Sequence, residues 1–168
     1  SYAFIAEDVL SSPDPAKSST DETVIEAMKR ASANIDARYA RSPGTAARLH
    51  LAVARAFYQR SDFDTARAEY ARAATLFGKA GEADSEDAVL GRLGSIHMDA
   101  TSGQPGRLEA AGAAIAKEQK ALGDRAKSGR IGFALAQSEG AYAYTADIER
   151  AERAIRRAVA IGSAPGSR

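Results

Sequence analysis

The sequence predicts an all-α domain, and three observations carry this prediction. Alanine occupies 39 of the 168 positions, and it favours helix because it loses no side-chain entropy there. Apolar residues recur three and four positions apart along most of the chain, which is the spacing of one helix face. No segment has the alternation of a strand, and turns of two to six residues separate the helical stretches. Such turns make consecutive helices antiparallel, so we expect stacked helical hairpins with about seven helices.

The start of the chain differs in composition from the rest. Residues 1–10 predict a short helix with one apolar side. Residues 11–20 contain two prolines and five hydroxyl residues, a composition that is typical of a linker. We expect the helical domain to cover residues 21–162 and residues 163–168 to form a disordered tail.

Each predicted helix of the domain has an apolar face and a turn signal at its end. The first begins after Thr20 or Asp21, either of which suits an N-cap, and Ser42-Pro43-Gly44 ends it. The six helices that follow are predicted over residues 45–60, 64–79, 85–100, 107–122, 125–145 and 147–161. Gly123 ends the helix over 107–122, which is the fifth of the seven.

Residues 47–80 show the most regular pattern, in which small residues alternate with aromatic ones on two successive helices. Small residues let two helix backbones approach closely, and aromatic rings fill the space toward the next helix pair. The pattern resembles a tetratricopeptide repeat, a helix–turn–helix unit of about 34 residues. The chain departs from that family at His50, where an aromatic is usual, and at Gly78, where proline is common. The matching positions are Val53, Ala54, Phe57, Phe63, Ala66, Tyr70 and Ala73.

Weaker copies of the pattern flank this unit. The middle copy aligns only with an insertion around Ser102 to Gly106, and Glu139 falls where a small residue is expected. The resemblance implies a right-handed solenoid of antiparallel hairpins, and the alternative is a non-repeat bundle. The matching positions of the weaker copies are Ala31, Ile35 and Pro43, then Leu93, Gly94, Ala111 and Ile115, and finally Leu135, Tyr142, Ala151, Ile155 and Ala158.

A second resemblance covers residues 1–60. Its order of short motifs is similar to the region that follows the membrane span in bacterial signalling proteins, namely winged-helix transcriptional regulators of the CadC type and receptor-like serine/threonine kinases with repeat-containing sensor regions. This resemblance implies a bacterial sensor or interaction domain, either the periplasmic part of a membrane-anchored protein or a cytoplasmic domain. The motifs are Phe4-Ile5, Asp8-Val9-Leu10, Asp14-Pro15, Thr23-Val24, Pro43 and Ala46-Ala47-Arg48-Leu49.

Composition and motifs argue against several function classes. The 23 basic and 22 acidic residues give a net charge of +1, whereas a polyanion-binding domain is normally strongly basic. The absence of cysteine excludes disulfides and thiolate metal sites. No stretch approaches the roughly 20 apolar residues needed to span a bilayer. His50 and His97 are far apart on predicted helices without metal-ligand spacing, so each is interpreted as structural or solvent-facing. We therefore expect no enzyme, metal, cofactor, nucleic-acid ligand or membrane insertion.

The remaining candidate is a surface. In a solenoid, the first helices of the hairpins line a concave groove, and side chains pointing away from the packing set would face it. Arginine can bind a carboxylate with two hydrogen bonds, and tyrosine adds an aromatic wall with a polar tip. The predicted groove residues are Arg48, Leu51, Arg55, Tyr58 and Gln59 from the helix over 45–60, Arg92 from 85–100, and Phe133, Gln137 and Tyr144 from 125–145.

The sequence thus predicts a non-enzymatic domain that binds a protein or peptide, acting as sensor or scaffold in a bacterial signalling or transcription-regulatory protein. The alternative is a small-molecule-sensing or dimerisation domain that controls an attached effector module.

Overall fold

The computed structural model describes residues 24–144 and 148–163, and in these residues the chain is all-helical, as predicted. The predicted helix over 1–10, the linker over 11–20 and the tail beyond Ser163 lie outside the described residues. The helices are α2 (Val24–Arg38), α3 (Pro43–Gln59), α4 (Phe63–Lys79), α5 (Glu86–Thr101), α6 (Pro105–Leu122), the 3-10 helix η1 (Gly123–Lys127), α7 (Gly129–Ala143) and α8 (Ile148–Gly162).

Local chemistry fixes most helix starts. Pro43 occupies the first turn of α3, where its missing N–H costs nothing. The side chain of Asp62 accepts a hydrogen bond of 3.2 Å from the Thr65 amide and caps α4. Ser85 caps α5 in the same way through the amide of Ala88, also at 3.2 Å. These caps explain why the starts of α4 and α5 lie within one residue of their predicted positions.

One predicted boundary is wrong. The helix predicted over 125–145 begins four residues later, because η1 and an extended Ser128 intervene before α7. Gly129 has a φ of +64°, a conformation that side-chain-bearing residues rarely adopt. A Cβ on Gly132 would lie 3.0 Å from the carbonyl oxygen of Ala126, so η1 packs directly onto the first turn of α7.

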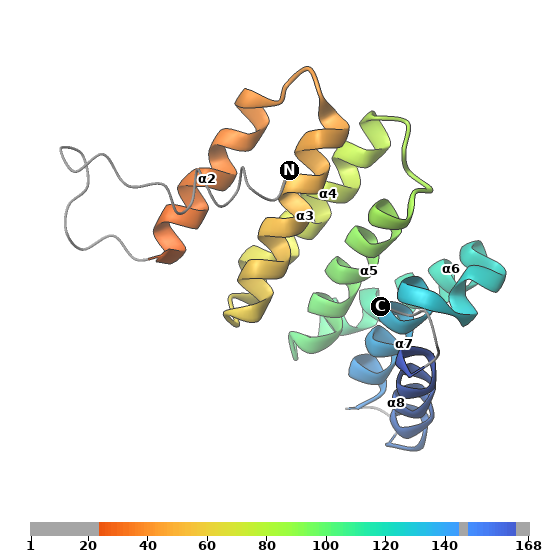
Figure 1. Cartoon of the computed structure of the whole chain (residues 1–168). Helices are drawn as coiled ribbons and strands as arrows, with labels where there is room; N and C mark the ends of the chain where they lie inside the picture. The colour runs from red at the N-terminus through yellow and green to blue at the C-terminus, as the bar shows by residue number, and fades with distance from the viewer. Residues whose placement is uncertain (1–23, 145–147, 164–168) are drawn as a thin grey trace.

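The helices pack against their neighbours in chain order, and α5 also contacts α7 (Figure 1). The first helices of three successive hairpins, α3, α5 and α7, begin at residues 43, 86 and 129, a spacing of 43 residues. The second helices, α4, α6 and α8, begin at 63, 105 and 148. This spacing is longer than the 34-residue unit expected from the sequence, which explains why the middle copy aligned only with an insertion.

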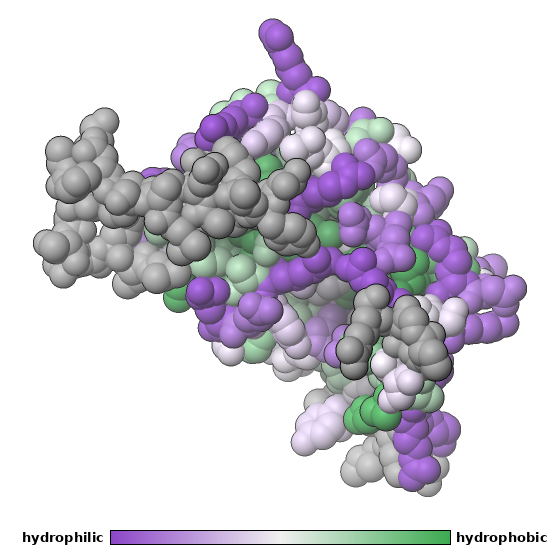
Figure 2. Space-filling model, viewed as in Figure 1, coloured by the Kyte–Doolittle hydropathy of each residue, from purple (hydrophilic) through white to green (hydrophobic). Residues whose placement is uncertain are grey.

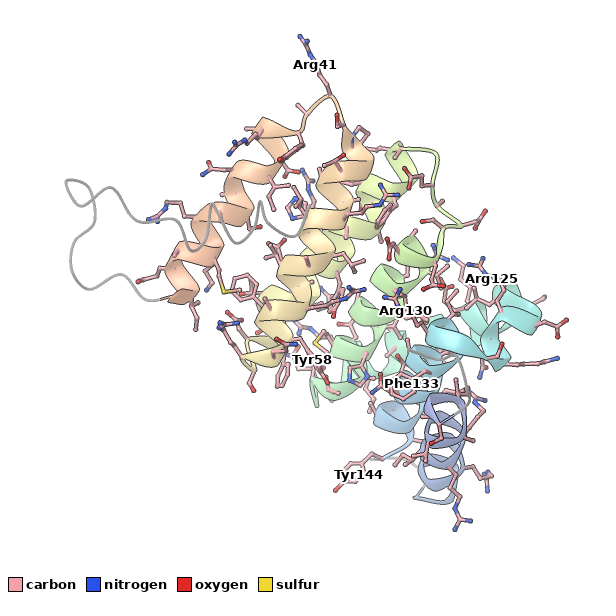
Figure 3. All side chains as sticks on the ribbon, in the orientation of Figure 1. Arg41, Tyr58, Arg125, Arg130, Phe133 and Tyr144 are labelled. Carbon is pink, nitrogen blue, oxygen red and sulfur yellow. The ribbon has the colours of Figure 1, made fainter. Side chains whose placement is uncertain are left out.

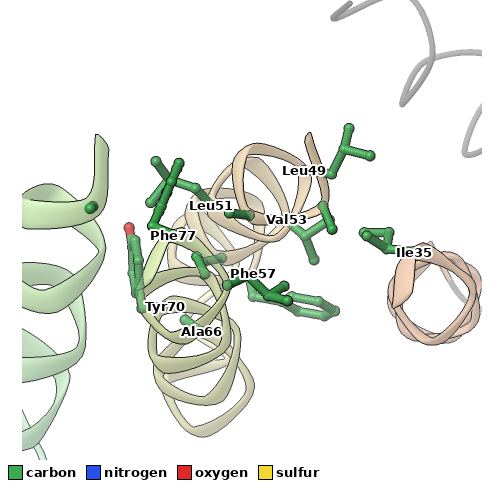
Figure 4. Close-up of a cluster of buried hydrophobic side chains, with 14 of the residues drawn as sticks. Ile35, Leu49, Leu51, Val53, Phe57, Ala66, Tyr70 and Phe77 are labelled. Carbon is green, nitrogen blue, oxygen red and sulfur yellow. The ribbon is translucent and has the colours of Figure 1, made fainter. Parts of the chain in front are cut away.

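Two clusters of buried apolar residues form the core. The first fills α2, α3 and α4, where Phe57 is fully buried and Ile35 of α2 faces Leu49 and Val53 of α3 (Figure 4). The second lies between α5, α6 and α7. Because α5 supplies Met98 to the first cluster and Leu93 to the second, this helix joins the two.

His50, the departure from the repeat pattern, is part of a buried polar network. Its side chain is only 3% exposed, its Nδ1 lies 2.6 Å from Glu69 Oε2, and its Nε2 lies 3.2 Å from Asp36 Oδ1. Both ring nitrogens therefore lie within hydrogen-bonding distance of a carboxylate oxygen. Ser32 donates to Glu69 over 2.6 Å, and Arg72 donates to Asp36. Histidine therefore replaces an apolar ring here in order to join α2, α3 and α4.

Burial alone would raise the pKa of Asp36, but the hydrogen bonds from Arg72 and His50 and their charges outweigh it. The pKa of this carboxyl is consequently lower than its usual value of 3.8. Within the described ranges, no helix is both long and apolar enough to cross a membrane.

Candidate functional site

A pocket of about 370 Å³ lies at the junction of the two core clusters. The last turns of α3, the middle of α5 and the start of α7 line it, and the final turn of α8 closes one side. Of the described residues, none from α6 reaches it. A volume of this size is at the small end of ligand-binding cavities.

Aromatic side chains line the pocket. Tyr58 of α3 is 39% exposed, and the centroids of its ring and the His97 ring are 6.0 Å apart in an edge-to-face arrangement. Phe133 of α7 lies near the final turn of α8, where a Cβ on Gly162 would be 3.5 Å from its ring. Figure 3 shows Tyr58, Arg130 and Phe133 in the same region of the molecule. Such walls suit an apolar or aromatic group.

The floor of the pocket is closely packed. Gly94 of α5 lies under the ring of Tyr70, and a Cβ at this glycine would be 2.6 Å from that ring. Leu93 is fully buried and Met98 is 2% exposed. The glycine is required because any side chain would occupy the place of the tyrosine.

Two arginines lie at the pocket, and they differ in their partners. Arg130 donates to Glu86 over 2.7 Å. Arg55 is partly buried, and in the described part of the chain no carboxylate forms an ion pair with it. Burial raises the pKa of the Tyr70 hydroxyl, and the charge of Arg55 opposes this shift, so the two groups are close enough to interact. The guanidinium of Arg55 is therefore available to pair with an anionic group of a ligand.

His97 supplies the third polar group of the pocket. Burial lowers the pKa of its imidazole below 6.5, so the ring is neutral at pH 7. Its Nδ1 is buried and, within the described residues, has no hydrogen-bond partner. A buried nitrogen without a partner costs free energy, and such atoms concentrate where structure serves function.

Four of the nine predicted groove residues meet at this pocket, and the other five do not. Arg55, Tyr58, Phe133 and Gln137 line it. Leu51 is only 3% exposed and belongs to the first core cluster, because α3 is covered by α2 on one side and α4 on the other. That placement corrects the prediction that it faces the groove.

Two of the five are held by carboxylates elsewhere. Arg48 pairs with Glu82, in the turn after α4. Arg92 binds both oxygens of Glu118 on α6, over 2.7 and 3.2 Å. The last two are exposed but do not line the pocket, and they are Gln59 and Tyr144, the latter pointing away in Figure 3.

Sequence reasoning missed several lining residues, including His97, Arg130 and Ile161. His97 follows Gly94 by three positions, as Phe57 follows Ala54, and this parallel is the signal that could have placed it. No local signal identifies Ile161, because only the packing of α8 brings its last turn to the pocket. No group of histidine, aspartate and glutamate in the described residues is arranged to hold a metal ion.

Comparison of the chain with protein-family models, with curated proteins and with solved structures finds no match.

Proposed function

We propose that the chain is a non-enzymatic binding domain built as a tetratricopeptide-like solenoid of helical hairpins. The even spacing of helix starts and the contacts of α3 with α4, α4 with α5 and α5 with α7 support this arrangement. In such a stack the first helix of each hairpin lies on the inner face. Most of the residues that line the pocket belong to α3, α5 and α7, which are those first helices, and Tyr70 of α4 and the last turn of α8 complete the lining.

The ligand of the proposed groove is a segment of a peptide or protein. The observation that carries this proposal is the pocket itself, where aromatic walls surround a guanidinium that lacks an acidic partner in the described chain. We place binding ahead of catalysis because the titratable side chains of the pocket are arginine, tyrosine and a neutral histidine. This set offers recognition more readily than a nucleophile activated by a base.

The wider proposal is that this domain is the sensor or scaffold of a bacterial signalling or transcription-regulatory protein. It is supported by the similarity of residues 1–60 to regions of that kind.

The alternative, a small-molecule-sensing or dimerisation domain, has two observations in its favour. The pocket volume of about 370 Å³ also suits a small ligand. Ile155 and Val159 of α8 are 53% and 61% exposed, and in the region of this helix Figure 2 shows a small hydrophobic patch among hydrophilic residues. A second copy covering these side chains would favour dimerisation, and light scattering over a range of concentrations measures it directly.

Photo-crosslinking tests the proposed function. A benzoylphenylalanine placed at Gln137, which is exposed and lines the pocket, should crosslink a protein from a bacterial lysate. The double variant Arg55→Glu/Tyr58→Ala should abolish this product while its circular dichroism stays unchanged. The same label at Arg41, remote from the pocket in Figure 3, is the matched control. A product that appears equally at both positions, or survives the double variant, would contradict groove binding.

A further inference from the structure

Arg55 differs from seven other arginines of the described helices in its lack of an acidic partner. Seven arginines of the described helices each form an ion pair with a carboxylate on another element. These residues are Arg48, Arg67, Arg72, Arg92, Arg107, Arg130 and Arg157. Arg55 is partly buried yet has no such pair, and no aspartate or glutamate is among the residues that line its pocket.

The surroundings of Arg55 make this lack of a partner informative. A guanidinium beside apolar surface interacts more strongly with an anion than one in open solvent, because fewer waters compete. Arg55 interacts electrostatically with the hydroxyl of Tyr70, but this hydroxyl is neutral and cannot balance the charge of the guanidinium. The site is therefore complementary to a carboxylate, which a guanidinium can bind through two parallel hydrogen bonds.

The rest of the pocket is largely apolar and favours an uncharged side chain. Tyr58, Phe133, Leu93 and Met98 all line it. Its volume of about 370 Å³ accepts one aromatic or branched aliphatic side chain and a small polar group beside it, but not a folded element. Of the two arginines that line the pocket, Arg130 is paired with Glu86, so Arg55 is the one whose guanidinium lacks an acidic partner beside this apolar surface.

We propose that the pocket binds an internal peptide segment in which an aromatic or branched aliphatic residue is adjacent to an aspartate or glutamate. The apolar side chain sits between Tyr58 and Phe133, and the neighbouring carboxylate pairs with Arg55. This inference rests on the proposed function, since a segment lying along α3, α5 and α7 presents side chains rather than a chain end.

Peptide display on the intact chain tests the inference. A library of random ten-residue peptides, fixed to a carrier at both ends, is selected on the wild-type protein and in parallel on Arg55→Glu and Arg55→Met. The control is Arg41→Glu, which makes the same charge change at an exposed residue far from the pocket (Figure 3). Circular dichroism and thermal unfolding confirm that each variant is folded.

Wild type and Arg41→Glu should enrich peptides with Asp or Glu next to Phe, Tyr, Leu or Ile. Arg55→Met should lose the acidic preference, and Arg55→Glu should replace it with lysine and arginine. Anisotropy of a labelled wild-type peptide should show at least tenfold weaker binding to Arg55→Met, the size expected for a lost charged hydrogen-bonded pair.

Three results would overturn the inference in different ways. Enrichment of peptides without acids, or of the same peptides by Arg55→Glu, would leave a peptide groove but remove the role of Arg55. Free N-acetylphenylalanine competing as well as the peptide would assign the pocket to small carboxylates instead. Failure of every protein to enrich any peptide would refute the proposed function itself.

Discussion

The hairpin of α3 and α4 and the hairpin of α7 and α8 are similar in length, with helices of 17 and 15 residues respectively. The first has α2 on one side and α5 on the other, and its large apolar residues are buried apart from Tyr58 and Phe63. In the second, α8 packs mainly against α7 and leaves Ile155 and Val159 more than half exposed. The same amphipathic pattern therefore gives a closed core where both sides are covered and an open apolar face where one is not.

This difference also places the pocket. The first cluster ends at α5, the second begins there, and the final turn of α8 reaches over the junction. Neither cluster alone encloses the hollow, so the shape of the pocket depends on how the two regions meet. The predictions below act on one region, on the other, or on the junction.

The largest effect is expected from Phe57→Ala in the first cluster. The ring is fully buried, and its removal leaves a cavity, so the free energy of unfolding should fall by about 3–5 kcal/mol. Urea denaturation followed by circular dichroism measures it. Tyr144→Ala, at a side chain that is 76% exposed, should change stability by less than about 0.5 kcal/mol. Equal losses for the two variants would contradict the placement of the core.

Removing the histidine of the polar network should act on one region alone. His50→Ala leaves Oε2 of Glu69 without its partner, while Ser32 still donates to Oε1, and should cost about 2–3 kcal/mol. Amide exchange should then speed up in α2, which His50 holds through Asp36, while α7 keeps its protection. Faster exchange in both regions would show that they do not differ in this respect.

Two glycines distinguish the junction from the exposed surface of the first region. Gly94→Ala forces its Cβ into the ring of Tyr70 and should destabilise the chain by about 1–2 kcal/mol. Gly78→Ala in α4 meets no atom within 4 Å and should stabilise the helix by about 0.5–1 kcal/mol. Melting temperatures that move in the same direction for both would contradict the close approach of α4 and α5.

The smallest effect concerns pH at the junction. The pKa of His97 is lowered by burial, so the unfolded chain binds a proton that the folded chain does not. Stability should be constant above pH 6.5 and should fall as the pH drops below it. Subtracting the pH profile of His97→Gln from that of wild type isolates this dependence. A difference that does not change between pH 7.5 and pH 5 would contradict it.

The sequence predicts the helix boundaries of the α3–α4 hairpin better than the start of the α7–α8 hairpin. Regular spacing and the caps at Asp62 and Ser85 made the helices of the first region predictable. The start of α7 was not predictable, because it depends on a 3-10 turn and a left-handed glycine at 129 rather than on periodicity.

Some predicted site residues line the pocket and others do not, and this difference also has a physical reason. Helical spacing gives the face of a residue on its own helix but not which neighbour covers that face. Spacing alone therefore predicts that Leu51 and Arg92 face the groove. In the structure, Leu51 is buried and Arg92 is paired with Glu118. Arg55 and Tyr58, by contrast, line the pocket, because no neighbouring helix fully covers their face of α3.

A nuclear magnetic resonance titration tests most directly whether the junction of the two regions is the binding site. The uniformly ¹⁵N-labelled protein is mixed with the peptide enriched by wild type. Amide shifts should change at the end of α3, along α5, at the start of α7 and in the last turn of α8, and Arg55→Glu should remove the changes. Shifts confined to α2, α6 or the exposed face of α8 would contradict the account.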